Sequence, residues 1–489
     1  MIRPLKYLSL LILLSSCQEE INQDVALKDV TDTEFIAELI ENGNLISPLT
    51  ATINTISRYE HTVQITIRGK QENDLTYTKR ELSKTHNIPL IGLYPGYTNV
   101  VDIKAYNASN QLVASREFEF LTDSLNIRFP KIEILHFDSV RLKERLSFVE
   151  YRVGINNIPF IYDQYGDIRW CLVYPEQSLV RPTILTNTQE FFCGDFGYEV
   201  FYRYDWLGNG DTIALPAGFK QLHHDIHQYD DHLFFPADKD YVLECDTNGN
   251  LIRSWNLAEI FKRYLPANQD IVKDGKDWLH VNSVFYQEAD NSLIISARQS
   301  AGIFKIDYAS GNIRWILSDT TMLWYSYPAL RKLALQPAPG CELPLGQHSP
   351  VALEKGRMLV LDNGYDGYER LDNQDGLISG GKGYSRLVVY RIDEQSMTAE
   401  QEFEYGRKQK RELFSRFAGS AGYDEKTDTY YGTFGNIVFQ KGAPVTGRQI
   451  EVGSDGTLLF DARLTSLKTV EMFFRGEKIN LNDVVNESK

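Results

Sequence analysis

Positive charge and long apolar runs are both scarce in this sequence. Its 489 residues include 51 Lys and Arg against 66 Asp and Glu, which gives a formal net charge of −15. That balance argues against a surface for nucleic acid or anionic lipid. Beyond the first segment, no stretch is long and apolar enough to span a bilayer. Hydrophobic residues at 43% and charged residues at 24% exclude disorder, collagen and coiled coil for the whole chain.

Cysteine is also rare, and several familiar catalytic motifs are missing. The spacing of Cys171, Cys193, Cys245 and Cys341 matches no metal-knuckle or Cys-x-x-Cys pattern. In an oxidising compartment these residues could form one or two disulfides, with no pairing favoured by the sequence. The chain contains no Gly-x-Ser-x-Gly, His-Glu-x-x-His, P-loop lysine or dinucleotide-binding motif.

The first residues are typical of an address signal. Arg3 and Lys6 precede an apolar run over residues 7–14, which is too short to cross a membrane and ends at Cys17 after two serines. This ending resembles the bacterial lipobox, in which the cysteine is lipidated. We predict a lipoprotein signal peptide and lipobox over 1–17, a polar tether over 18–44, and an extracytoplasmic, lipid-anchored protein. Gln18, where Asp would indicate inner-membrane retention, favours the outer membrane.

Residues 45–127 show the alternation of half-buried strands. Val63, Ile65 and Ile67 form one example, and a Pro95-Gly96 turn leads into another strand. The segment around that turn resembles the corner of fibronectin type III and immunoglobulin-like domains. We expect a small β-sandwich here.

A hairpin signature repeats in the region 130–489. Each copy has an Asp that can bond the backbone of its own turn, a Gly suited to positive φ, and a Trp that ends the second strand. The copies are Asp163/Gly166/Trp170, Asp246/Gly249/Trp255 and Asp307/Gly311/Trp315, with a degenerate copy near Asp393. Short strands repeating about every 60 residues over about 360 residues predict six blades. The fold class is therefore all-β, with a six-bladed β-propeller behind the sandwich.

Histidines gather at equivalent positions of this repeat. The pair His223–His224, then His280, then His348 each stand at a strand start before a turn and an apolar strand. Because such strand starts from different blades face one central channel, these side chains could meet in a single funnel. His227 and His232 lack equivalent positions, and we interpret them as structural.

Three converging imidazoles suit either a metal or an anion. Three histidines with an open position are a familiar zinc arrangement. The alternative is an oxyanion site that includes Arg298, one hairpin after His280, because a guanidinium repels a dication but matches a tetrahedral oxyanion.

The order of these motifs resembles the bacterial arylsulfate sulfotransferases that use no nucleotide sulfate donor. The most specific part is His280-x-Asn282 followed by Arg298. The other matching pieces are His223-His224-Asp225, Gln347-His348 before Asp362-Asn363-Gly364, and Ser385-Arg386.

That resemblance implies a ping-pong reaction in which a sulfuryl group passes from a phenolic sulfate ester to a histidine and then to a phenol. It implies His348 as the nucleophile, no cofactor and no metal. The sulfate-binding residues implied are His224, His280, Asn282 and Arg298. The partners would be small aryl sulfates and phenols, with no nucleic acid and no oligomeric state assigned.

The residue types suit this chemistry. Sulfuryl transfer through a loose transition state needs positioning and charge stabilisation. Burial and Arg298 should both lower the pKa of His348 and keep it neutral. His224 or His280 could exchange the phenolic proton, and Tyr325 and Phe434 are candidate walls for the aromatic ring. Two rival functions remain open, a metal-dependent propeller hydrolase and a non-enzymatic envelope scaffold or receptor.

Overall fold

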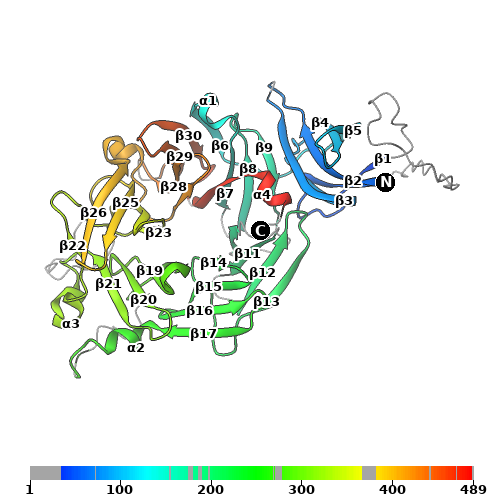
Figure 1. Ribbon diagram of the computed structural model, residues 1–489. Helices are drawn as coiled ribbons and strands as arrows, with labels where there is room; N and C mark the ends of the chain where they lie inside the picture. The colour runs from blue at the N-terminus through cyan, green and yellow to red at the C-terminus, as the bar shows by residue number, and fades with distance from the viewer. Residues whose placement is uncertain are drawn as a thin grey trace.

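The computed structural model describes residues 35–486 except 72, 154–155, 174–179, 185–189, 196–198, 268, 270–277, 366–380, 440–441 and 470. The predicted lipidation site, Cys17, and most of the predicted tether lie outside the described residues. Six sheets of four or five strands surround an axis, and a seventh sheet forms a separate N-terminal unit (Figure 1). The predicted all-β fold is confirmed.

The N-terminal unit is built around two long strands. Its strands are β1 (Phe35–Glu41), β2 (Thr50–Ile67), β3 (Leu75–Ile91), β4 (Thr98–Tyr106) and β5 (Leu112–Leu121). β1 pairs with the first half of β2 and β4 with its second half, while β3 pairs along both halves with an irregularity between Ile56 and Val63. Alternating side chains such as Ile53, Ile65 and Ile103 form the core. This alternation is the pattern read from the sequence.

The six blades follow the chain around the ring. Blade 1 is β10 (Val180–Ile184), β11 (Glu190–Asp195), β12 (Val200–Asp205) and β13 (Gly210–Ala214). Blade 2 is β14 (His227–Tyr229), β15 (His232–Ala237), β16 (Tyr241–Asp246) and β17 (Leu251–Asn256). Blade 3 is β18 (Val281–Gln287), β19 (Ser292–Ala297), β20 (Gly302–Asp307) and β21 (Ile313–Ser318).

The remaining blades combine distant parts of the chain. Blade 4 is β23 (His348–Ala352), β24 (Arg357–Asp362), β25 (Arg386–Asp393) and β26 (Thr398–Tyr405), with the short β22 (Gln336–Pro337) at its edge. Blade 5 is β27 (Ser420–Asp424), β28 (Thr429–Ile437), β29 (Thr446–Gly453) and β30 (Leu458–Thr465), with β6 (Lys131–Phe137) added. Blade 6 is β31 (Met472–Ile479) with β7 (Leu146–Val153), β8 (Asn156–Tyr162) and β9 (Ile168–Cys171).

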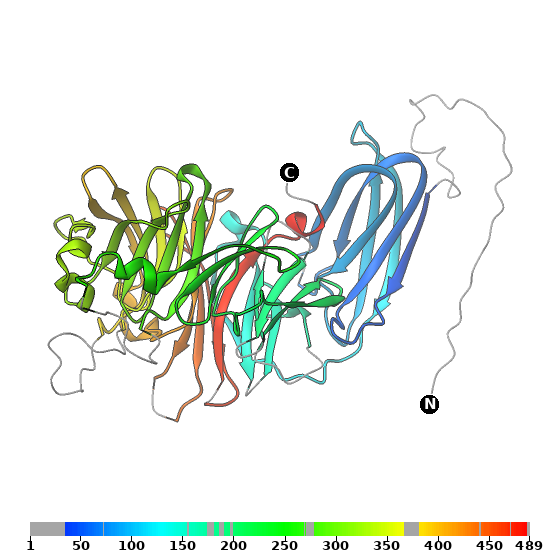
Figure 2. The same ribbon diagram turned by 90° about the horizontal axis from the view of Figure 1, so that it is seen from below.

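The ring is closed by the two ends of the propeller chain. β31 is the last strand, yet it pairs with β7, near the start of the propeller, and β6 pairs with β30. In Figure 2 the red β31 lies between the orange strands of blade 5 and the cyan strands of blade 6. The first strands of neighbouring blades contact one another (β14 with β18, β18 with β23, β23 with β27, β27 with β31), so they line the axis.

The repeated hairpins are the outer corners of blades. Gly166, Gly249 and Gly311 have φ values of 88°, 85° and 66°, as their turns require. In each turn the Gly N–H donates to the Asp three or four residues earlier, at 2.8–3.0 Å. Trp170 and Trp315 are fully buried between neighbouring elements. The sequence therefore predicted these corners correctly.

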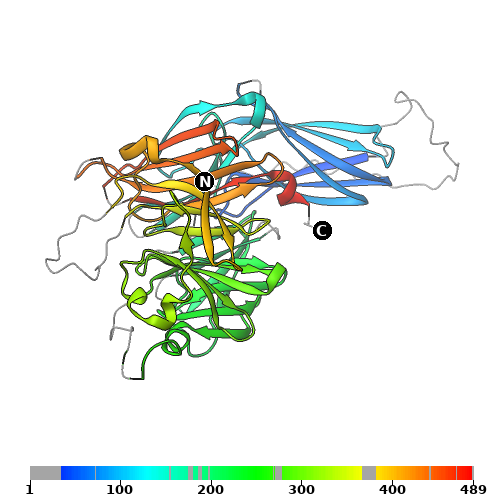
Figure 3. The ribbon, with the colours of Figure 1, turned by 60° about the vertical axis from the view of Figure 1, so that its left-hand side comes forward.

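The N-terminal unit and the propeller share a core. Helix α4 (Leu481–Val485) follows β31 and lies beside β3, where the Thr78 N–H donates to Asn482 Oδ1 at 3.0 Å (Figure 3). Leu481 and Val485 pack in the same apolar cluster as Ile65. The other helices are α1 (Ser139–Leu142), α2 (Leu257–Lys262) and α3 (Pro328–Arg331), with η1 (Glu288–Asp290), η2 (Leu323–Ser326) and η3 (Arg407–Glu412). None of the described helices has the length and apolar character to cross a bilayer.

The cysteines belong to the packing. Cys171, Cys245 and Cys341 are free thiols, and Cys193 is buried in an apolar core cluster. Burial raises the pKa of Cys171 and of Cys245 to about 12, which keeps both protonated.

Candidate functional site

The candidate site lies where the axial strands begin. His348 is the first residue of β23, His280 directly precedes β18, and His223 and His224 precede β14. Arg298 directly follows β19, and its N–H donates to the carbonyl of His280 at 3.1 Å. The β18–β19 hairpin therefore holds the backbone of Arg298 beside that of His280.

The backbone at these strand starts has an unusual conformation. His224, His280 and Ser349 have φ values of 67°, 52° and 48°, in the left-handed region. The pairing of β18 and of β23 with the next strand is irregular at the same point. A bulge with a left-handed residue redirects side chains, and non-glycine residues occupy this region at an energetic cost. Three equivalent strand entries share this cost, which is typical of a functional site.

Asn363, which follows β24, determines the tautomer of His348. Its Nδ2 donates to the carbonyls of Ser415 at 2.9 Å and Ala418 at 3.0 Å, so its Oδ1 must face the other way. That Oδ1 lies 2.7 Å from Nδ1 of His348. An amide oxygen can only accept, so Nδ1 carries the proton and Nε2 carries the lone pair.

The surroundings keep His348 neutral. The side chain is only 6% exposed. Burial and then the positive charge of Arg298 lower its pKa to about 3, and His280 acts in the same direction. Because Arg298 and His280 both act electrostatically on His348, the three side chains lie near one another. At neutral pH the Nε2 lone pair is thus available as a nucleophile.

The other histidines form a compact group beside it. Nε2 of His224 lies 2.9 Å from Nε2 of His280, so one ring donates to the other. His223 is buried, with Nδ1 2.7 Å from the carbonyl of Val281. His224 is more exposed than His223 and is joined to His280, and its role in binding sulfate stays a prediction.

Asn282 has a positioning contact that the sequence did not indicate. Its Nδ2 donates to the carbonyl of Gln347 at 2.7 Å, next to His348 in the chain. The side chain of Gln347 in turn donates to the carbonyl of Gly302 at 2.9 Å. These bonds connect blade 3 to the start of β23 and fix the residue before His348.

A close approach between two chain segments also supports His348. Gly346 has φ 63°, and a Cβ placed on it would lie 2.1 Å from the carbonyl oxygen of Tyr365. Only glycine allows the loop before His348 to pack this closely against the segment after Asn363.

The profile of the arylsulfotransferase (ASST) family matches residues 131–475, and that of the arylsulfotransferase Ig-like domain matches residues 40–120. The chain belongs to the arylsulfotransferase family. It is 23% identical over 524 aligned positions to the arylsulfate sulfotransferases AssT of Escherichia coli O6:H1 and Lelliottia amnigena, with 83% of this chain and 86% of each relative covered.

A solved structure of a protein of unknown function from Bacteroides caccae covers 69% of this chain and 99% of its own length, with 10% identity and a TM-score of 0.41.

Membership in the arylsulfotransferase family makes this protein an aryl-sulfate sulfotransferase. It excludes the non-enzymatic scaffold that the sequence had left open.

In this arylsulfotransferase, strand β31 supplies two site contacts that the sequence did not reveal. Arg475 forms an ion pair with Asp225 at 2.5 Å, and the ring of Phe474 stacks on His224 with centroids 5.4 Å apart and planes at 14°. Neither has a motif of its own, because Asp225 and Arg475 are 250 residues apart. Only the closed ring brings them together.

The aromatic residues of the site also differ from the predicted ones. Phe417 lies beside Arg298, with the guanidinium carbon 5.7 Å from the ring centroid. Phe434 is fully buried in the core around blade 5, so it is no wall for a substrate. Tyr325 lies in η2, after the outer strand of blade 3, against Trp324 and Arg331.

Ser385 and Arg386 belong to the support of Asn363. The Ser385 hydroxyl donates to the carbonyl of Asn363 at 2.6 Å, and Arg386 pairs with the fully buried Asp362 at 2.9 Å. These contacts fix the end of β24, so the pair acts behind the site and not in it.

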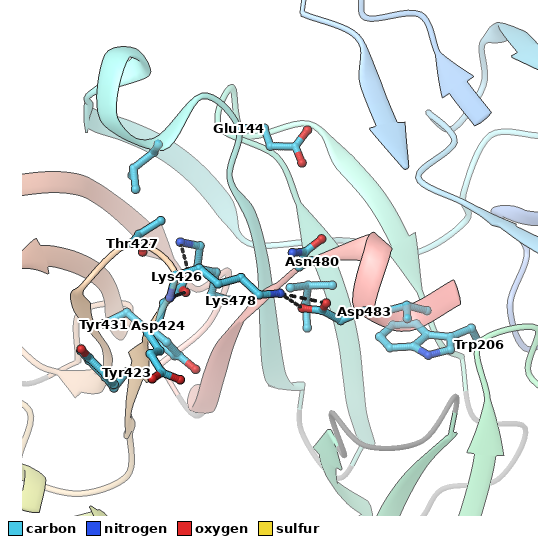
Figure 4. A pocket seen from close by; sticks show the side chains of 14 residues that line it. Glu144, Trp206, Tyr423, Asp424, Lys426, Thr427, Tyr431, Lys478, Asn480 and Asp483 are labelled. Atoms are coloured by element: carbon cyan, nitrogen blue, oxygen red, sulfur yellow. Dashed lines mark hydrogen bonds and ion pairs between the residues drawn. The ribbon is translucent and has the colours of Figure 1, made fainter. Parts of the chain in front are cut away.

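A cavity of about 370 Å³ lies at the C-terminal ends of β27 and β31, near α4 (Figure 4). Its two lysines already have carboxylate partners: Lys426 pairs with Asp483 at 3.0 Å and Lys478 with Asp424 at 2.6 Å. With its cations neutralised in this way, it suits a sulfate ester less well than the histidine group does.

One metal-ligating arrangement remains in the described residues. The ligating atoms of His223, His224 and His280 lie within 4.8 Å of one another. His348 is outside this group. A soft-to-borderline dication such as zinc would fit three imidazoles, although the positive charge of Arg298 nearby opposes it.

Proposed function

We propose that this arylsulfotransferase moves a sulfuryl group from a phenolic sulfate ester to a phenol through a sulfo-His348 intermediate. One observation carries the proposal: Asn363 fixes the proton of His348 on Nδ1, so a neutral Nε2 is held beside Arg298 and His280. A buried neutral imidazole next to a guanidinium suits attack on an anionic sulfate ester.

In the first half-reaction, Nε2 of His348 attacks sulfur, and the bond from sulfur to the phenolic oxygen breaks. Arg298 neutralises charge on the non-bridging oxygens. The leaving phenolate takes a proton from the His224–His280 pair. The imidazole then carries SO₃ on Nε2 and hydrogen on Nδ1, and Asn363 Oδ1 accepts from that hydrogen.

In the second half-reaction, the oxygen of an incoming phenol attacks sulfur and the bond from Nε2 to sulfur breaks. The phenolic proton returns to the His224–His280 pair, so each cycle restores the enzyme. A group-transfer mechanism of this kind predicts ping-pong kinetics.

Mass spectrometry after mixing with 4-nitrophenyl sulfate alone tests the intermediate. We expect one added sulfuryl group on the peptide that contains His348, its loss when phenol is added, and no adduct in His348→Ala. The matched control is His232→Ala, since His232 lies on β15 paired with Glu244. An adduct on another residue, or turnover by His348→Ala, would contradict the proposal.

A leaving-group series tests the proton transfer. His280→Gln should lower turnover of esters of weakly acidic phenols much more than that of 4-nitrophenyl sulfate, because a good leaving group needs less proton donation. Equal losses for all donors would show that His280 only binds sulfate.

The three-histidine group favours one second candidate, a metal-dependent hydrolase. It predicts activity that falls with chelators and returns with metal, together with one metal ion per chain lost in His223→Ala. Full activity in excess chelator would exclude it.

We also propose that Cys17 carries a lipid that anchors the enzyme outside the cytoplasm, with the outer membrane as its site. The apolar run and the small residues before Cys17 support this. Palmitate labelling and membrane fractionation test it: Cys17→Ala should lose both label and membrane association, and a labelled variant would refute the assignment.

A further inference from the structure

The segment 414–418, between η3 and β27, is tied to the nucleophile's support. Asn363 Nδ2 donates to the carbonyls of both Ser415 and Ala418, and the Ser385 hydroxyl accepts from the Ser415 N–H at 2.9 Å. The Ser415 hydroxyl accepts from the N–H of Asn436 at 2.9 Å. The amide that orients His348 therefore also fixes this segment.

Two side chains of the segment face different surroundings. Phe417 is half-buried next to Arg298, so an apolar ring borders the place where the sulfate would bind. Arg416 is exposed, with its guanidinium carbon 5.8 Å from the ring centroid of Tyr365, and the Tyr365 ring meets that of Phe414 at 6.3 Å. Tyr365 follows Asn363 by two residues, so both aromatic walls start from the nucleophile's support.

The charge of Arg416 differs in its surroundings from that of two arginines that support the site. Arg386 pairs with Asp362, and Arg475 pairs with Asp225. Arg416 forms no ion pair with any residue in the described part of the chain. In a protein with a net charge of −15, an exposed guanidinium that lies over an aromatic ring has N–H groups available to an anionic ligand.

We propose that Arg416, with Phe417 and Tyr365 as flat walls, forms a second anion subsite that selects phenols carrying a carboxylate on the far side of the ring. This rests on the proposed sulfotransfer. The acceptor would place its hydroxyl toward His348, its ring along Phe417 and its carboxylate against Arg416. A guanidinium binds a carboxylate with two parallel hydrogen bonds, whereas a neutral phenol would use the aromatic walls alone.

An isosteric pair of acceptors separates charge from shape. With 4-nitrophenyl sulfate as donor, we expect a lower KM for 4-hydroxyphenylacetate than for 4-hydroxyphenylacetamide. Arg416→Gln should raise the KM of the carboxylate on the order of 3- to 10-fold, the range of a partly exposed ion pair. It should leave the KM of the amide and both kcat values unchanged. Arg416→Lys should keep part of the preference, and the preference should shrink in high salt.

The control is Arg411→Gln, an exposed arginine of η3 whose guanidinium lies over Phe439, at 5.8 Å. It should change neither KM. Equal effects of Arg416→Gln on both acceptors, or none on either, would overturn the second subsite. Those results differ from failure of the proposed function, in which the unaltered enzyme would transfer sulfuryl groups to neither acceptor and form no adduct on His348.

Discussion

A single asparagine side chain decides which atom of His348 can react. Because the Nδ2 of Asn363 is used by two backbone carbonyls, its Oδ1 faces the imidazole and fixes the proton on Nδ1. A histidine with the opposite tautomer would present an N–H to the sulfur atom and could not attack. In the proposed mechanism, the chemistry therefore depends on a residue that does not touch the substrate.

Asn363→Ala should lower the burst of 4-nitrophenol from 4-nitrophenyl sulfate by about 100-fold, because the imidazole loses both tautomer and orientation. The donor KM should change little, since the sulfate-binding groups stay in place. Stopped-flow absorbance measures the burst. A large increase in KM with an unchanged burst would assign Asn363 to binding.

The pKa of His348 gives a second prediction. Burial and then Arg298 lower that pKa to about 3, so His348 should stay neutral from pH 8 to pH 5. Arg298→Leu removes the cation, so the pKa should rise while burial keeps it below 6.5. Nitrogen-15 NMR of labelled histidine without donor would detect this, with Arg411→Gln as the control. A lower pKa in Arg298→Leu would contradict the assigned sign.

The residues of the site differ in how far the sequence could reveal them. His280 and Arg298 were predictable because one hairpin joins them, and the Arg298 N–H to His280 carbonyl bond shows that register. Asn282 was predicted to bind sulfate, and its contact through Nδ2 with the carbonyl of Gln347 was not foreseen. Spacing along the chain gives the position of a residue but not the direction of its side chain. Arg475 could not be found, because no local pattern connects it to Asp225.

At the scale of elements, β31 braces the turn that carries His224. The Arg475–Asp225 ion pair and the stacking of Phe474 both reach across from the closing strand. His224 has a left-handed backbone, and such strained residues persist only where their surroundings hold them. β31 therefore positions a site residue in addition to completing blade 6.

A double-mutant cycle tests this role. Asp225→Asn should lower the free energy of unfolding by about 3 kcal/mol, because it breaks a largely buried ion pair while Glu477 and Glu150 still act on Arg475. Adding Arg475→Met should recover part of this loss. Denaturant unfolding measures both, and strictly additive losses would show that the pair is not coupled. The donor KM should rise in Asp225→Asn as His224 shifts, and in a purely structural role it would not.

Strands and turns were predicted correctly where the sequence repeats a motif. The Asp–Gly turns and buried Trp residues of the outer corners, such as Gly249 and Trp315, gave the blades. The pairing of β31 with β7 has no sequence signature, because hydrogen bonds between distant strands leave no periodic mark. Ring closure was therefore predicted only as part of the propeller fold, and no pattern in the sequence indicated which strands close the ring.

At the scale of the whole molecule, buried histidines couple folding to pH. Burial lowers the pKa of His227 to about 4, below the ordinary value of 6.5. Between pH 6.5 and pH 4 the unfolded chain binds a proton at His227 that the folded chain does not. The contribution of neutral His227 to the free energy of unfolding is therefore lost as pH falls below 6.5. Glu477, whose pKa burial raises to about 7, has the opposite effect and loses stability as pH rises from 4.5 through 7.

A variant that lacks His227 separates the effect of this histidine on stability from that of Glu477. His227→Phe should become more stable relative to the unaltered protein by about 2 kcal/mol on going from pH 8 to pH 5, because the variant has no proton to exclude. Thermal or denaturant unfolding at both pH values measures this. The control is His136→Phe, since His136 in β6 is exposed. A pH-independent difference for His227→Phe would contradict the assignment.

Closure by β31 has a consequence for the way the enzyme is made. Arg475 and Phe474 come from the last strand of the ring, near the C-terminus, and they complete the surroundings of His224. A growing polypeptide that already contains His280 and His348 still lacks this brace. A product that ends before β31 should therefore leave the turn at His224 unsupported.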